Sequence, residues 1–480
     1  GAGTAWRAKN MQTILISNRV AEPSRGGAMP GGLAAALYAA TDKNGAWWIG
    51  SSGKHTRENS NEPPIHAKNI GAGKLITVDF PANLYRNFYN GMSNSAIWPI
   101  LHDRADLLHY DERFFQAYSE INDLMADAIA RLAQPDALIW IHDYHFFMLG
   151  ECLRRRGITN PIGFFLHTPF PTASVLSCMP QHKAIMKSLA AYDLIGFQTG
   201  NDLLRFRDYA TTELTATLTG QTTLRFGKDR VQIGVFPIGI NVERFAEAAE
   251  RNLKTRRLNR MRHDLHEGNL VIGVDRLDYS KGLPLRFESY EQFLTLYPDE
   301  RKRVSFLQIT PPTRSEVESY RRIRGELAAK AGDINARFGS VDWAVLRYVN
   351  ESFSPDELAG FYRMSKVACV TPLRDGMNLV AKEYIAAQNP EDPGVLVLSR
   401  FAGAAQELNA ALLVNPYDTE EVARSLHQAL YMPHAERVER WETSMRVLRK
   451  ADLQSWYDSF FVALRSASIK PADSTTLSVA

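Results

Sequence analysis

The strongest constraint on this chain is the alternation of short apolar runs with longer helical stretches. Three of the runs are Ala137–His142, Ile162–Leu166 and Asp193–Phe197, and segments such as 111–131 and 147–156 have helical composition. This alternation predicts βαβ units and a parallel sheet. Polar residues follow the three runs at Asp143–His145, His167–Thr168 and Gln198–Thr199. Ligands of such sheets bind outside the carboxyl ends of the strands, so these positions predict a site.

The same pattern restarts after Val231–Gly239, a segment that has the composition of a last strand followed by a hinge. The second series of apolar runs covers 270–274, 304–309, 345–349, 367–371 and 395–399. We therefore predict an α/β protein with two doubly wound halves. The predicted domains span 11–238 and 239–450, and 451–470 is predicted to be a helix that packs back on the first domain.

Composition excludes several classes of protein. A chain of 480 residues is long enough for two full cores, and a net charge of +3 gives no reason to expect nucleic acid or a membrane. No apolar run approaches about 18 residues, so no span is predicted. Cys152, Cys178 and Cys369 are far apart and show no zinc spacing, which favours a reduced, cytoplasmic setting. Gly1–Asn10 lacks an apolar signal core and is expected to be a loose leader.

The stretch Thr371–Glu383 combines a strand end, a turn and the start of a helix predicted over Met377–Gln388. Gly376 stands at the mouth of that helix, where free N–H groups suit an anion. Asp375 on the turn is suited to accept hydrogen bonds from sugar hydroxyls. Glu383 lies about 10 Å further along at about 1.5 Å per residue. This spacing fits a nucleotide sugar, although an ordinary strand–turn–helix with a solvated glutamate has the same sequence pattern.

Cations also stand near predicted strand ends. Arg276 and Lys281 share one loop after the strand at 270–274 and suit a diphosphate leaving group, although a surface charge pair is the alternative. Arg19 ends the first predicted strand, beside the glycine-rich segment Ser24–Leu33. A strand, a glycine loop and a helix bring backbone N–H groups against a diphosphate, but a flexible loop is the alternative here because the glycines do not form GxGxxG.

Two further segments have no clear periodicity. Gly53–His66 is polar and contains a double proline, which predicts an exposed, mobile loop. Tyr85–Pro99 is rich in aromatic residues, and its Tyr89 and Trp98 are candidates for the wall of a sugar site. The alternative is that both rings belong to the core.

Taken together, these motifs resemble the trehalose-6-phosphate synthases, which are retaining glycosyltransferases with two Rossmann-like domains facing a central cleft (GT-B type). The resemblance runs from about Thr13 to about Phe461. Its markers are SNR at Ser17–Arg19, GGL at Gly31–Leu33, WP at Trp98–Pro99, IHDYH at Ile141–His145, GFFLHTPFP at Gly163–Pro171, GFQT at Gly196–Thr199, RLDYSKG at Arg276–Gly282, TPLRDGMNLVAKEY at Thr371–Tyr384, FAGAA at Phe401–Ala405 and VNPYD at Val414–Asp418.

The resemblance implies roles for the residues that match the family's motifs. The UDP-glucose donor would be held by Gly32, Arg276, Lys281, Asp375, Gly376, Met377, Asn378, Leu379, Val380 and Glu383. The glucose 6-phosphate acceptor would be held by Arg19, Tyr89, Trp98, Asp143 and Arg314. The residues nearest the chemistry would be Arg276, Lys281, His167 and Asp375. No metal or other cofactor is implied.

The implied reaction joins UDP-glucose and glucose 6-phosphate into α,α-trehalose 6-phosphate with release of UDP, the first step of trehalose biosynthesis. Two alternatives remain open at this point. One is a related glycosyl- or pseudo-glycosyltransferase with another nucleotide donor, and the other is a non-catalytic sensor of sugar phosphate. The family also implies a homo-oligomer, a dimer or a tetramer, and a separate trehalose-phosphate phosphatase that acts downstream.

Overall fold

The computed structural model describes residues 11–24, 29, 31–57 and 61–469. The expectations for the leader, for Gly26 and Gly27 of the glycine-rich segment and for the last residues lie outside the described residues. No helix in the described ranges is both long enough and apolar enough to cross a bilayer.

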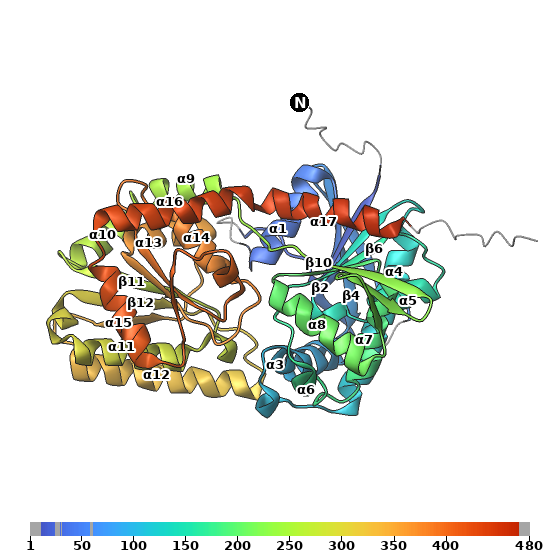
Figure 1. Ribbon diagram of the computed structural model, residues 1–480, viewed down its shortest axis with the longest axis horizontal. Coiled ribbons are helices and arrows are strands. Elements are labelled where there is room, and N and C mark those ends of the chain that lie inside the picture. The colour runs from blue at the N-terminus through green and yellow to red at the C-terminus, as the bar shows by residue number, and fades with distance from the viewer. Residues whose placement is uncertain (1–10, 25–28, 30, 58–60, 470–480) are drawn as a thin grey trace, which may run out of the picture.

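The first half is built on a large sheet that has ten strands in the part of the chain described (Figure 1). Its parallel strands, in spatial order, are β4 (Gly73–Pro81), β2 (Trp47–Thr56), β1 (Thr13–Arg19), β5 (Leu138–His142), β6 (Ile162–Leu166), β7 (Leu194–Phe197) and β10 (Asp229–Val235). Antiparallel strands extend both edges, namely β3 (Ile65–Ile70) beside β4, and β9 (Thr223–Phe226) and β8 (Thr217–Thr219) beside β10. The central parallel strands β5, β6 and β7 are fully buried, which explains their continuous apolar composition.

Helices connect these strands, and short helical turns lie at several strand ends. The α-helices are α1 (Gly32–Asn44), α2 (Ala82–Arg86), α3 (Trp98–Leu101), α4 (Glu112–Leu132), α5 (Leu149–Arg155), α6 (Ala173–Leu176), α7 (His182–Lys187) and α8 (Gly200–Glu213). Between α2 and α3, Asn87–Ile97 forms a π-helical segment. Short 3₁₀ turns cover Ala105–Leu107, Tyr144–Phe146 and Ser188–Ala191.

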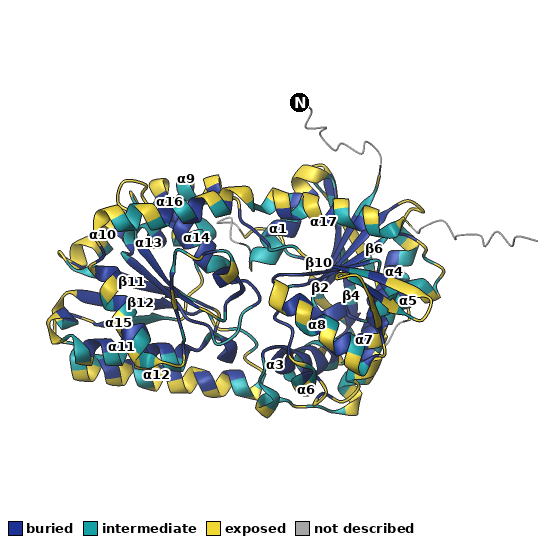
Figure 2. Ribbon diagram, viewed as in Figure 1, coloured by how far each residue is buried: buried dark blue, intermediate teal, exposed yellow. Residues whose placement is uncertain are grey.

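The second half contains a six-stranded parallel sheet within the described residues, and its central strands are drawn in the dark blue of buried residues in Figure 2. In spatial order they are β13 (Leu346–Val349), β12 (Val304–Ile309), β11 (Asn269–Val274), β14 (Val367–Val370), β15 (Val395–Ser399) and β16 (Leu412–Val414). The α-helices are α9 (Val242–Asn252), α10 (Arg256–Asp264), α11 (Leu283–Leu296), α12 (Glu318–Phe338), α13 (Pro355–Met364), α14 (Leu379–Ala387), α15 (Thr419–Leu430) and α16 (His434–Lys450), with 3₁₀ turns at Tyr279–Lys281, Pro298–Lys302 and Gly403–Gln406.

The predicted α/β class with two doubly wound halves is confirmed, one local expectation was wrong, and one segment without a prediction is helical. Gly53–His66 is not one loop, because β2 continues to Thr56 and pairs with β4, and β3 begins at Ile65. Tyr85–Pro99 is helical throughout, with the π-helical segment at its centre.

The chain passes between the halves twice, at residues 236–240 and again near 451–453. The two passages touch, because the Leu453 N–H donates to the Ile240 carbonyl at 3.2 Å. A Cβ atom on Gly239 would lie 2.2 Å from the Ala451 carbonyl oxygen, so only glycine fits there. The last helix, α17 (Leu453–Ser468), then runs back over the first half, continuing the line of α16 in Figure 1.

Helix α17 is fixed to the first sheet by aromatic packing. The Phe460 ring is fully buried and stacks on Trp140 with 4.2 Å between ring centroids. Glycines at 163 and 196 make room for it, because a Cβ atom there would lie 2.6 and 2.9 Å from the Phe460 ring. The C-terminal segment is therefore part of the core of the first half.

We expect Phe460→Ala to lower the free energy of unfolding by about 3–5 kcal/mol, because it removes a buried ring and leaves a cavity. Urea denaturation measures this change. Val462→Ala on the same helix is the control, since its side chain is exposed and the substitution should cost less than about 0.5 kcal/mol. Equal denaturation midpoints for the two variants would contradict the packing role of Phe460.

Candidate active site

The polar residues predicted at strand ends converge where the two halves meet. Each sheet reverses its strand order, between β1 and β5 in the first half and between β11 and β14 in the second. These reversal points are where ligands bind in open α/β sheets. Arg19 ends a strand of the first sheet and Asp143 and His167 follow two others, whereas Arg276 and Asp375 follow strands of the second sheet.

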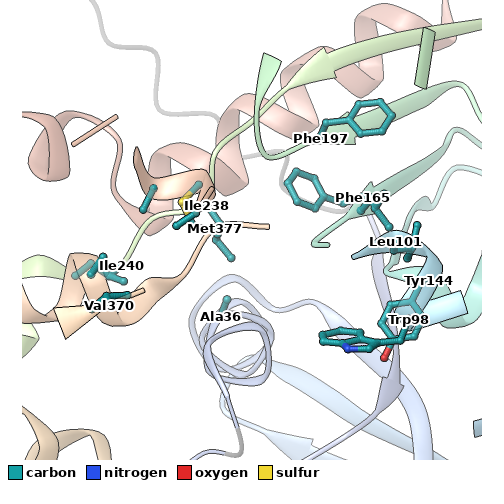
Figure 3. Packing of buried hydrophobic residues seen from close by; sticks show 14 of the residues in the cluster. Ala36, Trp98, Leu101, Tyr144, Phe165, Phe197, Ile238, Ile240, Val370 and Met377 are labelled. Carbon is teal, nitrogen blue, oxygen red and sulfur yellow. The ribbon is translucent and has the colours of Figure 1, made fainter. Parts of the chain in front are cut away.

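Direct contacts join the two rims. The Arg374 Nε atom lies 2.8 Å from an Asp103 carboxylate oxygen, and the Asn90 amide donates to Glu316 at 3.1 Å. In Figure 3, Trp98 and Tyr144 of the first half face Met377 and Ile238 across this junction. The structure thus places the predicted donor and acceptor residues around one interface.

Asp375 is held by two partners from its own half. The Lys281 ammonium lies 2.5 Å from Asp375 Oδ2, and the Asn378 amide donates to the same oxygen at 3.1 Å. The side chains of Lys281 and Asp375 are only 12% and 16% exposed. Within the described residues, Asp375 Oδ1 has no hydrogen-bond partner, so this oxygen is free to accept from a sugar hydroxyl.

The turn that carries Asp375 is packed tightly on both sides. A Cβ atom on Gly376 would lie 1.7 Å from the His167 carbonyl oxygen of the first half. A Cβ atom on Gly403 would lie 1.8 Å from the Gly376 carbonyl oxygen. Both positions therefore require glycine, and the turn lies between the two halves with backbone against backbone.

Helix α14 begins directly after this turn. Asn378, at φ 76°, caps it by accepting the Ala381 N–H at 3.4 Å. Leu379 meets Gly32 of the first half so closely that a Cβ atom on Gly32 would lie 2.2 Å from Leu379 Cδ1. The remaining predicted donor residues on this stretch are the buried Met377 and the half-buried Val380.

Further along the same helix, Glu383 accepts a hydrogen bond from Tyr362 Oη at 3.3 Å. Burial raises the pKa of the Glu383 carboxyl to about 7, even though the Tyr362 hydroxyl and the Arg244 charge favour the ionised form. A carboxyl group in this setting is a hydrogen-bond partner for hydroxyl groups.

A buried cluster fixes the donor loops of the second half. Arg286 is fully buried and forms a two-point ion pair with Asp275, at the end of β11. It also donates to Thr371 Oγ1 at 2.8 Å and lies 3.5 Å from the Lys281 carbonyl oxygen. Gln308 on β12 donates to Asp275 at 2.9 Å. The sequence alone does not assign a role to Arg286, because a lone arginine in a helix carries no signal of burial.

Arg314 crosses from the second half to the first. Its guanidinium lies 4.1 Å from the centroid of the Trp98 ring and donates to Tyr144 Oη at 2.9 Å and to Tyr320 Oη at 2.8 Å. Asp278 lies 3.6 Å away. Burial opposes its charge, but Tyr144, Tyr320, Tyr89 and Asp278 outweigh this and hold the pKa of Arg314 above its ordinary value.

Trp98 contacts a cation of the donor site as well as Arg314, because the Arg276 guanidinium also lies over its ring, 5.7 Å from the centroid. Asp278 is fully buried beside them. Burial pushes the pKa of Asp278 upward, but Arg314 and then Arg276 outweigh it and hold the value at about 2. Tyr144 and Asp278 lie within the motifs IHDYH and RLDYSKG, but their contacts with Arg314 could not be predicted from the sequence.

Arg19 and Tyr89 occupy the far side of the acceptor region. Arg19 lies over Gly53, where a Cβ atom would be 2.6 Å from the guanidinium. The Tyr85 ring stacks on Tyr89 at 5.6 Å, and Tyr89 stacks on His145 at 6.0 Å. This row of rings continues toward Arg314 through Tyr144, which stacks on His145 and accepts a hydrogen bond from Arg314.

Asp143 and His167 adjoin the turn from the first half. Asp143, at φ 80°, accepts the His167 N–H at 3.2 Å. Burial raises the pKa of Asp143 to about 6 against the opposing effects of its N–H donors, Arg314 and Arg276. Burial lowers the pKa of the His167 ring to about 3, so this ring is neutral at neutral pH. Throughout the described ranges, His, Cys, Asp and Glu side chains form no group of three or more suited to a metal ion.

Two parallel α/β sheets meet at a junction that holds cations suited to phosphate and carboxylates suited to sugar hydroxyls. This arrangement is that of a nucleotide-sugar-dependent glycosyltransferase. The sequence model of Glycosyltransferase family 20 matches residues 15–466, and the chain belongs to this family.

Known relatives resemble the chain over nearly its whole length. A trehalose-6-phosphate synthase of Sinorhizobium fredii is 44% identical over 458 residues, which cover 95% of this chain and 98% of that protein. A Burkholderia xenovorans alpha,alpha-trehalose-phosphate synthase (UDP-forming), solved in complex with glucose-6-phosphate, is 42% identical with a TM-score of 0.92, covering 95% of this chain and 100% of that chain. An E. coli structure bound with UDP-2-fluoro glucose is 39% identical with a TM-score of 0.89, covering 96% of this chain and 100% of that chain.

We expect Glu383→Gln to remove one component of the pH dependence of stability. The folded pKa of about 7 lies above the ordinary 4.5, so the stability that Glu383 contributes is fully present below pH 4.5 and is lost as the pH rises through about 7. Between about pH 5 and 8 the ligand-free protein should lose about 2 kcal/mol relative to the variant. Urea denaturation at fixed ionic strength measures this difference, and a difference that stays constant with pH would contradict it.

Proposed function

We propose that this chain transfers glucose from UDP-glucose to glucose 6-phosphate, which gives α,α-trehalose 6-phosphate and UDP as the first step of trehalose biosynthesis. One observation carries the proposal. The second half brings to the junction both a lysine–carboxylate turn suited to a nucleotide sugar and an arginine suited to a sugar phosphate, which lies over Trp98 of the first half. Relatives that are described as bound to glucose-6-phosphate and to UDP-2-fluoro glucose support the same pair of substrates.

On the donor side, Arg276 and Lys281 bind the diphosphate, with backbone N–H support from Gly32. Asp375 and Asn378 bind the hydroxyls of the transferred glucose. This assignment is supported by the free Oδ1 of Asp375 and by the ion pair that holds its other oxygen. The remaining donor contacts come from the backbone and apolar atoms of Gly376, Met377, Leu379 and Val380, and Glu383 binds the ribose hydroxyls.

On the acceptor side, Arg314 and Arg19 bind the phosphate of glucose 6-phosphate with the hydroxyl of Tyr89. Trp98 walls the pocket, and Asp143 binds an acceptor hydroxyl. The charged state of Arg314 supports this role, since a guanidinium pairs well with phosphate oxygens.

The transfer keeps the configuration at the anomeric carbon through substitution on one face. A double displacement needs a carboxylate on the opposite face of that carbon. We assign Asp375 and Asp143 to sugar hydroxyls instead, which leaves substitution on one face. A phosphate oxygen of the departing UDP takes the acceptor's proton, while Arg276 and Lys281 stabilise its growing negative charge. The His167 carbonyl lies beside the turn that holds the donor glucose.

The proposal extends to the organisation of the chain. Residues 11–238 form the acceptor domain, 239–450 form the nucleotide-sugar domain, and 451–470 form the helix that returns to the first. We further infer a cytoplasmic homo-oligomer, a dimer or a tetramer, whose product a separate trehalose-phosphate phosphatase consumes.

The proposed function is tested by release of UDP from UDP-glucose in the presence and absence of glucose 6-phosphate. We expect release that depends on the acceptor, with a non-reducing disaccharide phosphate as the product seen by mass spectrometry. GDP-glucose and ADP-glucose are compared as donors, and glucose as an acceptor without the phosphate. Acceptor-independent hydrolysis, or no turnover with any pair, would contradict the proposal.

Arg314→Ala should raise the KM for glucose 6-phosphate by about 10- to 150-fold, which corresponds to about 1.5–3 kcal/mol for a lost charged hydrogen bond. Steady-state kinetics at saturating UDP-glucose measure the change, and a melting curve checks that the variant is folded. Arg322→Ala on the exposed side of α12 is the matched control and should leave KM unchanged. An unaltered acceptor KM in Arg314→Ala would remove Arg314 from the phosphate site.

A further inference from the structure

A chain of buried hydrogen bonds connects the passage between the halves to the donor turn. Gln198 directly follows β7 and is almost completely buried. Its Oε1 accepts the Ile238 N–H at 2.9 Å, and its Nε2 lies 3.4 Å from His167 Nδ1. The His167 Nε2 in turn lies 3.0 Å from His142 Nδ1.

Ile238 is held from both halves. Its N–H is bound by Gln198 of the first half, and its carbonyl accepts from Lys382 Nζ of α14 at 2.7 Å. Lys382 is buried and is also paired with Glu407 at 2.6 Å. Ile238 lies beside Met377 in Figure 3. The passage at Ile238 is therefore fixed to the helix that carries the donor residues and to the strand end beside His167.

The hydrogen bonds dictate how the protons are distributed along this chain. Because the Ile238 N–H can only donate, it must meet the oxygen of the Gln198 amide, and the NH₂ group must face His167. His167 Nδ1 then accepts and carries no proton, so its Nε2–H donates to His142 Nδ1. The remaining proton lies on His142 Nε2, a fully buried atom without a hydrogen-bond partner in the described part of the chain, next to the Trp140 ring.

This arrangement uses both nitrogens of the His167 ring inside the protein. The group that His167 presents to the donor turn is instead its carbonyl oxygen, which packs against Gly376. The ring sets the position of that carbonyl, and Gln198 sets the position of the ring.

We propose that Gln198 is a positioning residue for glucosyl transfer, whose amide couples the passage at Ile238 to His167 and thereby sets how His167 meets the donor turn. The inference rests on the function proposed above but assigns a role to a residue outside both substrate sites. When the two halves move relative to each other, Ile238 and the donor turn move together, because the Lys382 side chain joins them.

The kinetic test uses Gln198→Leu, which removes both amide contacts at similar volume. We expect kcat to fall about tenfold, as for a displaced reacting geometry, while the Kd for UDP alone stays within about twofold because the donor residues on α14 are untouched. Gln232→Leu on β10 is the matched control, since that amide bonds only to threonine side chains at the sheet edge, and it should keep wild-type kcat. Wild-type kcat in folded Gln198→Leu would overturn the proposal.

The second test needs no turnover and detects the proton on His167 by NMR of ¹⁵N-histidine-labelled protein. Wild-type His167, assigned by single histidine replacements, should be the Nε2–H tautomer. In Gln198→Glu the carboxylate still accepts the Ile238 N–H, but it has no N–H to donate to His167 Nδ1. His167 Nδ1 must then donate to the carboxylate, so the ring should change to the Nδ1–H tautomer.

The two tests separate this inference from the proposed function. An Nδ1–H tautomer in an active wild-type enzyme would overturn only the role of Gln198. Failure of the wild type to release UDP, with His167 in the expected tautomer, would overturn the proposed function and with it the catalytic meaning of the hydrogen-bond chain.

Discussion

The buried pair of Arg286 and Asp275 is the interaction on which the donor site depends. A buried ion pair is stable only when its remaining hydrogen-bonding capacity is satisfied, and here Thr371, Gln308 and the Lys281 carbonyl satisfy it. These partners come from the ends of β11 and β12, from the residue after β14 and from the loop that bears Lys281. The Arg286 guanidinium therefore fixes the relative positions of the loops that present Lys281 and Asp375, although it contacts neither the Lys281 ammonium nor the Asp375 carboxylate.

Close backbone contact is the second constraint. At Gly376 and Gly403 the chain approaches neighbouring carbonyl oxygens so closely that no side chain fits. Ion pairs and hydrogen bonds from Arg374 to Asp103 and from Asn90 to Glu316 join the rims around this contact. These contacts hold the rims of the two halves against each other around the turn that carries Asp375.

The sequence predicted the central parallel strands of both sheets, because strands buried on both faces are continuous apolar runs. It did not predict the parallel strands β2, β4 and β16, nor the antiparallel strands β3, β8 and β9. Residues of β3 and β8 are largely exposed and carry no continuous apolar run. The polar residues that follow strands, such as Asp143, His167 and Arg276, do lie at the junction, whereas Arg314 was named only through the family resemblance.

The partners of those residues could not be predicted. Arg314 and Tyr144 are 170 positions apart, and their contact depends on how the two halves are placed. Burial of Arg286, the hydrogen-bond chain through Gln198 and the approach of two guanidinium groups to the Trp98 ring are likewise products of tertiary structure. Sequence patterns identified which groups carry charge at the strand ends, but not which neighbours hold them in place.

The return of α17 to the first sheet has a consequence for biosynthesis. During translation, the strands of the first half are made hundreds of residues before the helix whose Phe460 covers glycines 163 and 196. Until the ribosome has released that helix, a strip of apolar sheet surface stays exposed. Chaperones or other nascent chains can bind to this surface. The first half is thus synthesised before the second half but is completed only after it.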